Sequence, residues 1–456
     1  MASGSTGSVP RLQDREISNE LGNLRSIIDE MEADLGRLER AAQGPGATPV
    51  QQENFRTAAA IYPPEMDRRK RLVEELEARQ ITDDKLRFAD AKVQDEYETR
   101  DALLQALRGL DSSAKRIEAR LAATRSLHEV TLLDAKAAWD EAIASINNRS
   151  LGPLYDGLVI RPQLGLVPLR RDESTGRWEF WHVLSGERPT ADATGRWKLG
   201  PESGIILILI PGGEAVAGAQ REDVTKARFD ADASPRERLR RARLDPYFVA
   251  KYELTQGQVL FITDRYFSSI VVGMQPKDTP RVTRLNPVES IDWVRSNDLL
   301  ESVGLVLPTE LQWEFAARAG GTGRFGKSDD FDAVRPLVNY SDSAVAKNSR
   351  NIPSAPGEDG YYAHAPVDAF GPNAFGLHAV LGNVSEWCRD SFEDDLGSYP
   401  PRGGDGLAVP KLMTRRSVRG GSYLGLPTDQ RLSARRQFAP LDSRPDVGVR
   451  AARALE

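Results

Sequence analysis

The chain has 456 residues, about three times the ~150 residues typical of one domain, so two or three structural units are expected. Hydrophobic residues make up 40% and charged residues 28%, which allows a real core and excludes wholesale disorder. The formal net charge of −6 offers no basic field for a polyanion, so we expect no nucleic-acid partner. The longest strongly apolar run, residues 205–210, is far shorter than the ~20 residues that cross a bilayer. The chain as given is expected to be soluble, and cytoplasmic rather than secreted.

Residues 1–10 have the composition of a tag or linker, and we expect them to be disordered. Beyond them, apolar residues recur at alternating spacings of four and three, at Ile17, Leu21, Leu24, Ile28, Met31, Leu35 and Leu38. This heptad pattern is typical of a helix that buries a narrow seam, and helical character resumes after Pro64, so residues 11–147 are predicted to be a helical coiled-coil region. Its other faces are charged, so the helices pair either as an antiparallel hairpin or across a homodimer.

The composition of the chain and the predicted type of element change after residue 147. Residues 148–198 contain short β-rich pieces between prolines and glycines and are predicted to form a small β unit. Residues 199–454 alternate short apolar strands with long loops and a few helices, which indicates an α+β domain. Thr309 and Gln312 form a capping box, which places a helix over residues 310–318.

Six motifs follow one another in the last 250 residues. They are residues 208–213 (ILIPGG), 252–258 (YELTQGQ), 307–318 (LPTELQWEFAAR), 376–377 (GL), 382–387 (GNVSEW) and 418–423 (VRGGSY). Together they resemble the sulfatase-modifying factor family, the formylglycine-generating enzyme superfamily. The resemblance implies a C-type-lectin-like fold with a surface groove that, in the enzymes, holds an extended cysteine-containing peptide. The β unit before it resembles the segment that precedes such domains in bacterial multidomain proteins, including some kinases.

The resemblance implies copper chemistry that this chain lacks the ligands to perform. The enzymes oxidise a substrate cysteine with a copper ion held by two thiolates shortly after the Gly-Gly-Ser-Tyr motif. Those positions fall on Gly425 and near Gln430, and Cys388 is the chain's single cysteine. Because soft thiolates are the ligands that suit Cu(I), copper is not expected. Iron-dependent relatives draw a histidine cluster from an N-terminal helical domain, whereas residues 11–147 contain only His128. No catalytic residue is therefore predicted, and the chain reads as a pseudoenzyme.

Calcium is the cofactor that we expect, because carboxylate, amide and carbonyl oxygens suit hard cations. The resemblance implies a first site made by the side chains of Asn339 and Asp359 with the backbone carbonyls of Tyr340 and Tyr361. The alternative is a turn in which Asp359 makes only local hydrogen bonds.

A second, weaker calcium site is implied at the Gly-Asn-Val-Ser-Glu segment. Its ligands would be the backbone carbonyls of Gly382 and Val384 and the Glu386 carboxylate. The remaining side-chain ligand of that family site falls on Ala379, and the loss of one oxygen weakens cation binding.

The predicted function is binding of a peptide or protein partner, with the coiled coil used for oligomerisation or docking. The groove residues that we expect are Ser422, Tyr423, Gly425, Gln430 and Arg435. Arginines at 415–416, 419 and 435–436 are either internal or solvated ion pairs or a surface that recognises an acidic peptide. Two other functions stay open: a divergent sulfatase-modifying factor or metal-dependent oxidoreductase, which predicts bound copper or iron, and a C-type-lectin-like variable display protein, which predicts variation confined to residues 424–436.

Overall fold

The computed structural model describes residues 124–456 apart from 276–278, 350–351, 393–398 and 409–414, together with residues 121–122 and a scatter of residues between 21 and 73. The chain divides into two compact units, Met1–Arg116 and Ile117–Glu456. Each unit is described by itself.

In the first unit, nearly all the described residues are helical, and Leu21, Leu24 and Ile28 of the heptad seam are buried. Lys70 Nζ lies 2.7 Å from Glu32 Oε1, an ion pair that joins two helical stretches of the same chain. This contact favours hairpin pairing over that part. Residues 74–120 lie outside the described residues, so the coiled coil and the homodimer stay predictions.

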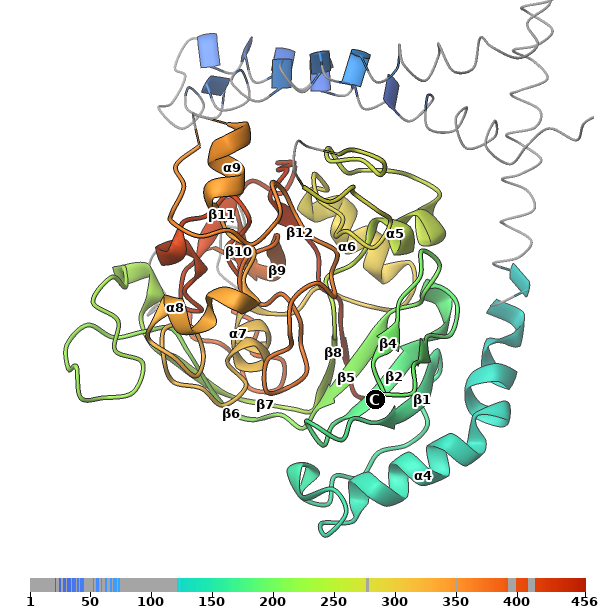
Figure 1. Cartoon of the computed structure of the whole chain (residues 1–456). Coiled ribbons are helices and arrows are strands. Elements are labelled where there is room, and N and C mark those ends of the chain that lie inside the picture. The colour runs from blue at the N-terminus through green and yellow to red at the C-terminus, as the bar shows by residue number, and fades with distance from the viewer. Residues whose placement is uncertain are drawn as a thin grey trace, which may run out of the picture. The chain divides into compact units, whose positions relative to one another are not determined.

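The second unit combines helices with two main sheets (Figure 1). Its α-helices are α4 (Lys136–Asn147), α5 (Gln256–Thr263), α6 (Trp293–Glu301), α7 (Glu310–Arg318), α8 (Phe331–Val334) and α9 (Ser343–Asn348), and a π-helical turn at Glu129–Asp134 precedes α4. Its strands are β1 (Leu166–Arg171), β2 (Trp178–His182), β3 (Thr190–Ala191), β4 (Trp197–Lys198), β5 (Ile206–Ile210), β6 (Gly213–Ala217), β7 (Arg240–Leu244), β8 (Tyr247–Ala250), β9 (Ser385–Ser391), β10 (Arg416–Arg419), β11 (Arg436–Phe438), β12 (Val447–Gly448) and β13 (Ala452–Ala454).

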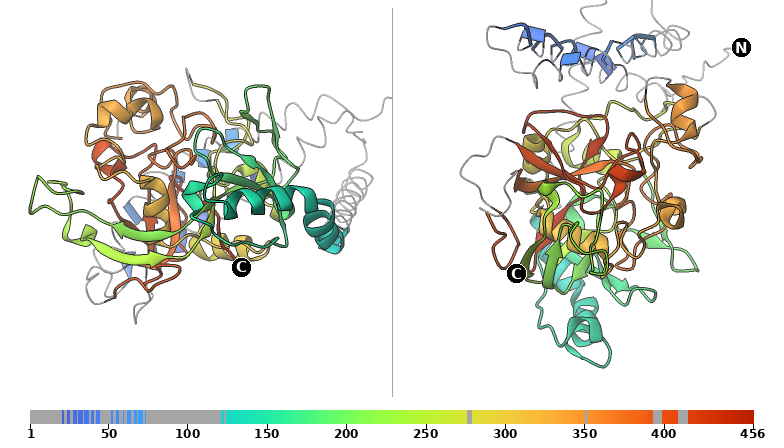
Figure 2. Two further views of the ribbon diagram at one scale, coloured as in Figure 1. Left: turned by 90° about the horizontal axis from the view of Figure 1, so that it is seen from below. Right: turned by 90° about the vertical axis from the view of Figure 1, so that its left-hand side faces the viewer.

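An antiparallel five-stranded sheet, in the order β1-β2-β5-β8-β13, joins segments from both ends of this unit. All five residues of β5 are buried, as a continuous apolar run predicts for a central strand. Helix α4 packs along β1, and Figure 2 shows it beside these strands in a second view. Its Trp139 is fully buried, with its ring centroid 5.5 Å from that of Phe180 of β2.

The structure therefore divides the chain elsewhere than at the predicted boundaries. Residues 117–147 belong to the second unit rather than to a separate helical region of 11–147. Strands β1 and β2, predicted within a separate β unit of 148–198, are hydrogen-bonded into the sheet of the domain predicted at 199–454. The apolar face of α4 and the edge of β5 are covered only when these segments combine, which is the physical reason for one core.

The second main sheet has four strands in the order β11-β10-β9-β12, and the predicted groove residues lie on the segment between β10 and β11. Strand β12 runs parallel to β9, whereas β10 is antiparallel to both β9 and β11. Helix α7 packs against β6, β9 and β10. The predicted capping box begins this helix, because Thr309 N–H donates to Gln312 Oε1 at 3.1 Å and Gln312 N–H donates to Thr309 Oγ at 3.2 Å.

The predicted α+β class is confirmed for the second unit. Over the described residues, every helix is too short or too polar to span a bilayer.

Candidate functional site

Four of the five predicted groove residues, all but Arg435, lie on one loop, residues 420–430, which follows β10 and is called here the groove loop. Gly420 and Gly421 begin it with φ of 103° and 70°, a left-handed conformation that a glycine adopts without strain. The backbone N–H of Tyr423 donates to the Asn383 carbonyl at 2.8 Å, and the Tyr423 hydroxyl donates to the Pro445 carbonyl at 3.3 Å. The groove loop is thus fastened to two neighbouring segments.

The buried side chain of Gln430 makes hydrogen bonds to the backbone of the groove loop. Its side chain is fully buried, and Nε2 donates to the carbonyls of Ser422 and Gly425, each at 3.0 Å. A Cβ added to Gly425 would lie 2.8 Å from this nitrogen. The Gln430 amide therefore fills the space beside Gly425 and holds both ends of the 422–425 turn.

Arg435, the remaining predicted groove residue, forms a buried ion pair with Glu310. Its side chain is 1% exposed, and Nη2 lies 2.9 Å from Oε1 of Glu310, a carboxylate that also pairs with Arg240. Although burial opposes ionisation of Glu310, Arg435 and Arg240 outweigh it and hold the pKa of this carboxyl well below its ordinary value. The structure thus places the guanidinium of Arg435 inside the domain.

A second charged cluster adjoins Ser422 and was not identified from sequence. Ser422 Oγ donates to Oδ2 of the buried Asp446 at 3.1 Å, and Arg436 Nη1 lies 2.7 Å from the same oxygen. Arg444 Nε is 3.7 Å from Oδ1. Burial opposes ionisation of Asp446, but Arg436 and Arg444 outweigh it and lower its pKa to about 2. No spacing signal in the sequence pairs these residues, because Asp446 is 24 positions from Ser422.

In the first predicted calcium site, the Asp359 carboxylate contacts the backbones of Tyr340 and Tyr361. Asp359 accepts hydrogen bonds from the backbone N–H of Tyr340 at 3.0 Å and of Tyr361 at 2.9 Å. Burial, helped by the nearby Asp342, raises the pKa of Asp359 to about 7, although the two N–H groups favour its ionised form. Asn339 is fully buried, and its Oδ1 has no hydrogen-bond partner within the described part of the chain.

Asn339 Oδ1 and the Asp359 carboxylate are oxygen groups of the kind that a hard cation binds. An unpartnered buried amide oxygen and a buried carboxylate that resists ionisation are both relieved by a bound divalent ion. Asp342 adds a carboxylate that the sequence comparison did not include: it caps α9 by accepting from Ala344 N–H and also accepts from Asp359 N–H. Its Asx-type role at a helix start is the signal that could have drawn attention to it.

The second predicted calcium site does not fit. The Glu386 carboxylate receives Arg450 Nη2 at 2.7 Å, Arg450 Nε at 2.9 and 3.0 Å, and Trp313 Nε1 at 2.6 Å. Both charged side chains are 1% exposed. With both oxygens already occupied by donors, Glu386 has no lone pair directed to a cation.

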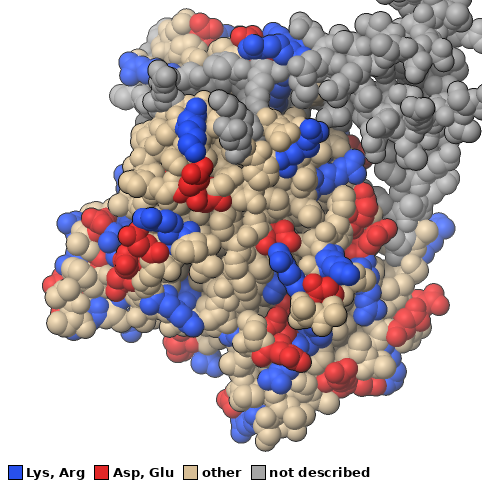
Figure 3. Space-filling view, in the orientation of Figure 1, with Lys and Arg blue, Asp and Glu red and all other residues tan. Residues whose placement is uncertain are grey.

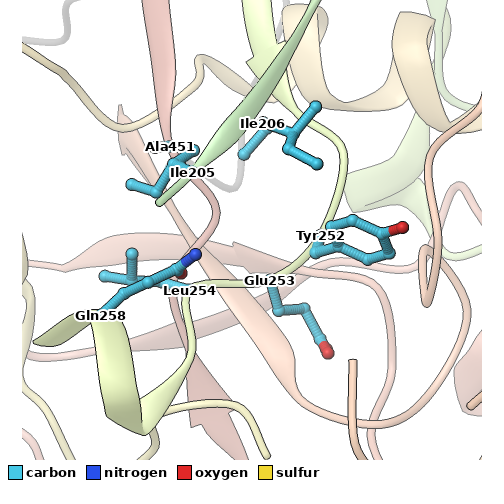
Figure 4. Close-up of a pocket in the computed structure, with 8 residues that line it drawn as sticks. Ile205, Ile206, Tyr252, Glu253, Leu254, Gln258 and Ala451 are labelled. Carbon is cyan, nitrogen blue, oxygen red and sulfur yellow. The ribbon is translucent and has the colours of Figure 1, made fainter. Parts of the chain in front are cut away.

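Asn383, between Gly382 and Val384, connects Asn339 of the first predicted calcium site to the groove loop. Its Oδ1 accepts from Asn339 Nδ2 at 3.1 Å, and its carbonyl accepts from Tyr423. Its Nδ2 donates to Glu253, a buried carboxyl in the wall of a cavity of about 10 Å³ (Figure 4). Burial, with the nearby Glu386, raises the pKa of Glu253 to about 8. A cavity of this size holds about one water molecule, so it is no substrate pocket.

The comparisons with known proteins decide the family. Residues 201–455 match the "Sulfatase-modifying factor enzyme 1-like domain", the FGE-sulfatase family. The chain belongs to this family. It is 32% identical over 183 residues to the formylglycine-generating enzyme of Thermomonospora curvata, covering 37% of this chain and 55% of that protein. It is 33% identical over 174 residues to the enzyme of Streptomyces coelicolor, covering 37% and 52%. The match thus spans about half the length of these curated relatives.

Other relatives differ in name. The serine/threonine-protein kinase pkn1 of Chlamydia pneumoniae is 23% identical over 266 residues, which is 54% of this chain and 38% of the kinase. Among solved structures, variable protein 1 of Treponema denticola matches 58% of this chain and 99% of its own, with 18% identity and a TM-score of 0.44. PvdO from Pseudomonas aeruginosa matches 59% and 99%, with 21% identity and a TM-score of 0.44.

In the sulfatase-modifying factor domain of this chain, the residues at the expected copper positions do not fit copper. Gly425 has no side chain, and the hard amide of Gln430 is engaged by two carbonyls. The one thiol, Cys388, is fully buried on β9, and burial raises its pKa well above its ordinary value. A thiol held in its protonated form is neither a nucleophile nor a metal ligand.

Proposed function

We propose that this chain is a non-catalytic member of the formylglycine-generating enzyme family that binds a peptide or protein partner along the groove loop. The observation that carries the proposal is the Gln430 amide, which bridges the carbonyls of Ser422 and Gly425 where the family's resemblance places two thiolates. The loop is rigidly hydrogen-bonded and lacks soft ligands, so it offers a shaped surface rather than an oxidising centre.

A conversion assay tests the non-catalytic part. The purified chain is incubated with a cysteine-containing peptide, oxygen and Cu(I), and the peptide is weighed by mass spectrometry. We expect the cysteine to remain unchanged over times in which a catalytic relative converts the peptide fully. Turnover of the peptide at a rate that depends on added copper would contradict the proposal.

The binding part needs its own measurement. Binding of a peptide along the groove loop should slow hydrogen exchange of the backbone amides over residues 420–430, including the Tyr423 N–H that already donates to Asn383. Protection confined to other elements would place the partner elsewhere.

The first cation site is the second element of the proposal. Asn339 and Asp359 would hold calcium by their side chains and Tyr340 and Tyr361 by their carbonyls, with Asp342 adjacent. The bound ion would supply charge neutralisation and rigidity, not chemistry on a substrate. Support comes from the unpartnered Asn339 Oδ1 and the raised pKa of Asp359.

The helical N-terminal unit is proposed as the docking or oligomerisation arm. The Glu32–Lys70 contact supports an intrachain hairpin for the part that the structure describes. Light scattering of the full chain after size exclusion distinguishes the two pairings, because a hairpin predicts a monomer mass of 50.3 kDa and a paired coiled coil predicts twice that value.

A further inference from the structure

A cluster of arginines and aromatic rings lies beside the groove loop and is called here the arginine–aromatic patch: Trp293, Arg416, Arg436, Phe438 and Arg444. Arg416 of β10 is the direct cross-strand partner of Phe438 of β11, so their side chains share one face of the sheet. The Arg416 guanidinium lies 3.6 Å from the Trp293 ring centroid. Those of Arg436 and Arg444 lie 5.0 and 4.9 Å from the Phe438 centroid.

The patch holds more positive charge than its neighbours neutralise. Arg436 and Arg444 share a single carboxylate, that of Asp446. For Arg416 we find no ion pair with any described residue, and its Nη1 donates to the Arg389 carbonyl at 3.0 Å. Over the described residues, the three guanidinium groups thus form ion pairs with one carboxylate, and Arg416 has only the electrostatic influence of Asp390 besides, so positive charge stays in excess.

Two donors of the patch lack acceptors. The Nε atoms of Arg416 and Arg444 are buried and have no hydrogen-bond partner within the described part of the chain. The side chains of Arg436 and Arg444 are 31% and 28% exposed, so an incoming ligand can reach both guanidinium groups. A planar guanidinium stacked on a ring is held in place and loses little freedom when it binds a carboxylate.

Other arginines near the groove loop behave differently. Arg419 is fully buried and pairs with Glu314, and Arg435 pairs with Glu310. Their charge is neutralised inside the domain, and they offer nothing to a partner. The contrast lies in exposure: Arg419 and Arg435 pair inside the domain, whereas Arg436 and Arg444 keep about a third of their side chains at its surface.

The patch continues the groove loop. Ser422 Oγ and the two arginines of the patch contact the same Asp446 carboxylate, and the Tyr423 hydroxyl donates to the preceding carbonyl, that of Pro445. Ser422 and Tyr423 are themselves buried, but a peptide laid over the exposed part of the groove loop, residues 424–429, would reach Arg436 and Arg444 within its next few residues.

We propose that the arginine–aromatic patch binds the carboxylates of an acidic peptide segment, an inference that rests on the proposed binding function and names the chemistry of its partner. Bidentate guanidinium–carboxylate pairs with the exposed parts of Arg436 and Arg444 would neutralise the excess charge. A nucleic acid is disfavoured because acidic and basic side chains intermingle on the face of the molecule in Figure 3, which offers no continuous basic surface there, and because the whole chain has a net charge of −6.

The test is fluorescence anisotropy on the full chain at low salt, about 50 mM, where ion pairing is least screened. The probe is a fluorescein-labelled decapeptide of six glutamates flanked by pairs of glycines, and its matched partner carries six glutamines. We expect the glutamate peptide to bind at least about tenfold more tightly. Equal binding of the two peptides, or binding of neither, overturns the inference.

Variants locate the binding. R444Q and R416Q should each weaken binding of the glutamate peptide roughly three- to tenfold. R243Q is the matched control, because Arg243 on β7 is 74% exposed and pairs with the equally exposed Glu214; it should change affinity less than about twofold. R416Q removes the contact with Trp293, so R444Q serves as the variant that leaves that packing intact. Equal losses in R444Q and R243Q overturn the location.

Rival outcomes are separable. A 12-base-pair DNA duplex that displaces the glutamate peptide at lower concentration than unlabelled peptide does would replace the acidic-peptide inference with phosphate recognition. Conversion of a cysteine peptide would refute the non-catalytic proposal while leaving the anisotropy result valid. Protection of the groove loop by a neutral peptide, with no preference for glutamate, would support groove binding and refute the acidic partner.

Discussion

Glu386→Gln is the substitution that most directly tests how this domain uses its buried charges. In the wild type, Arg450 makes its ion pair with Glu386 and also donates to the carbonyls of Ala250, Lys251 and His378. The substitution keeps the size of residue 386 and removes its charge. The guanidinium then remains buried without its ion-pair partner, and one of the amide hydrogens of the new side chain faces its donors.

The expected cost is about 3–5 kcal/mol of unfolding free energy, the range for removing one partner of a buried pair. The folded unit spans about 340 residues, and an unfolding entropy of about 2.1 cal/mol/K per residue then gives a fall in Tm of about 4–7 °C. Glu214→Gln is the matched control. Glu214 and Arg243 are both 74% exposed and 3.5 Å apart, so this change should cost less than about 1 kcal/mol.

The assay is calorimetry of both variants and the wild type, each in calcium and in EDTA. If the role of Glu386 is to neutralise Arg450, the melting temperature of Glu386→Gln should fall by the same amount in calcium and in EDTA. A fall of less than about 2 °C would refute the argument from buried charge. A fall seen in calcium but absent in EDTA would show that Glu386 ligates the cation, and would restore the second predicted site.

Three further predictions concern the groove loop, the patch and the cation site. Gly425→Ala should lower the unfolding free energy by about 1–3 kcal/mol, because the new Cβ would lie 2.8 Å from Gln430 Nε2. Adding Gln430→Ala should recover part of that loss. Strictly additive effects of the two substitutions in urea titrations would contradict the packing argument. Asp446→Asn should cost about 2 kcal/mol of unfolding free energy at pH 7, because the folded pKa of about 2 lies below the ordinary 3.8. This stabilisation is present above pH 4 and is lost as the pH falls toward 2, so the difference from wild type should shrink to about half near pH 3. A difference that is independent of pH would refute the assignment. Calcium at about 100 times its Kd should stabilise the wild type by about 2.7 kcal/mol and should leave the Asp359→Asn variant nearly unchanged. Thermal melts with calcium and with EDTA measure both effects. A wild type whose melting does not respond to calcium would refute the first predicted calcium site.

Local signals in the sequence predicted local structure well. The capping box at Thr309 and Gln312 located helix α7, and the apolar run of residues 205–210 contains the buried strand β5. Both depend on interactions within a few residues, which a single sequence carries in full.

Interactions between distant segments were the ones that sequence reasoning missed. Arg450 and Glu386 are 64 positions apart, and nothing near either residue indicates the other. Residues 11–147 were predicted to be a helical coiled-coil region, whereas Trp139 of α4 packs with Phe180 in the core of the second unit. Gln430 was expected in the groove, but its bridging role depends on a loop geometry that only coordinates reveal.

The order of strands in the five-stranded sheet bears on how the protein is made. Strand β8 pairs with β13 through residues 247–249 and 452–454, so its outer edge stays unpaired until about 200 more residues have been added. At about 5–20 residues per second, this exposes the edge of an apolar sheet for roughly 10 to 40 s during translation. Chaperone occupancy during synthesis, and aggregation of chains interrupted between β8 and β13, therefore follow from the position of one short strand.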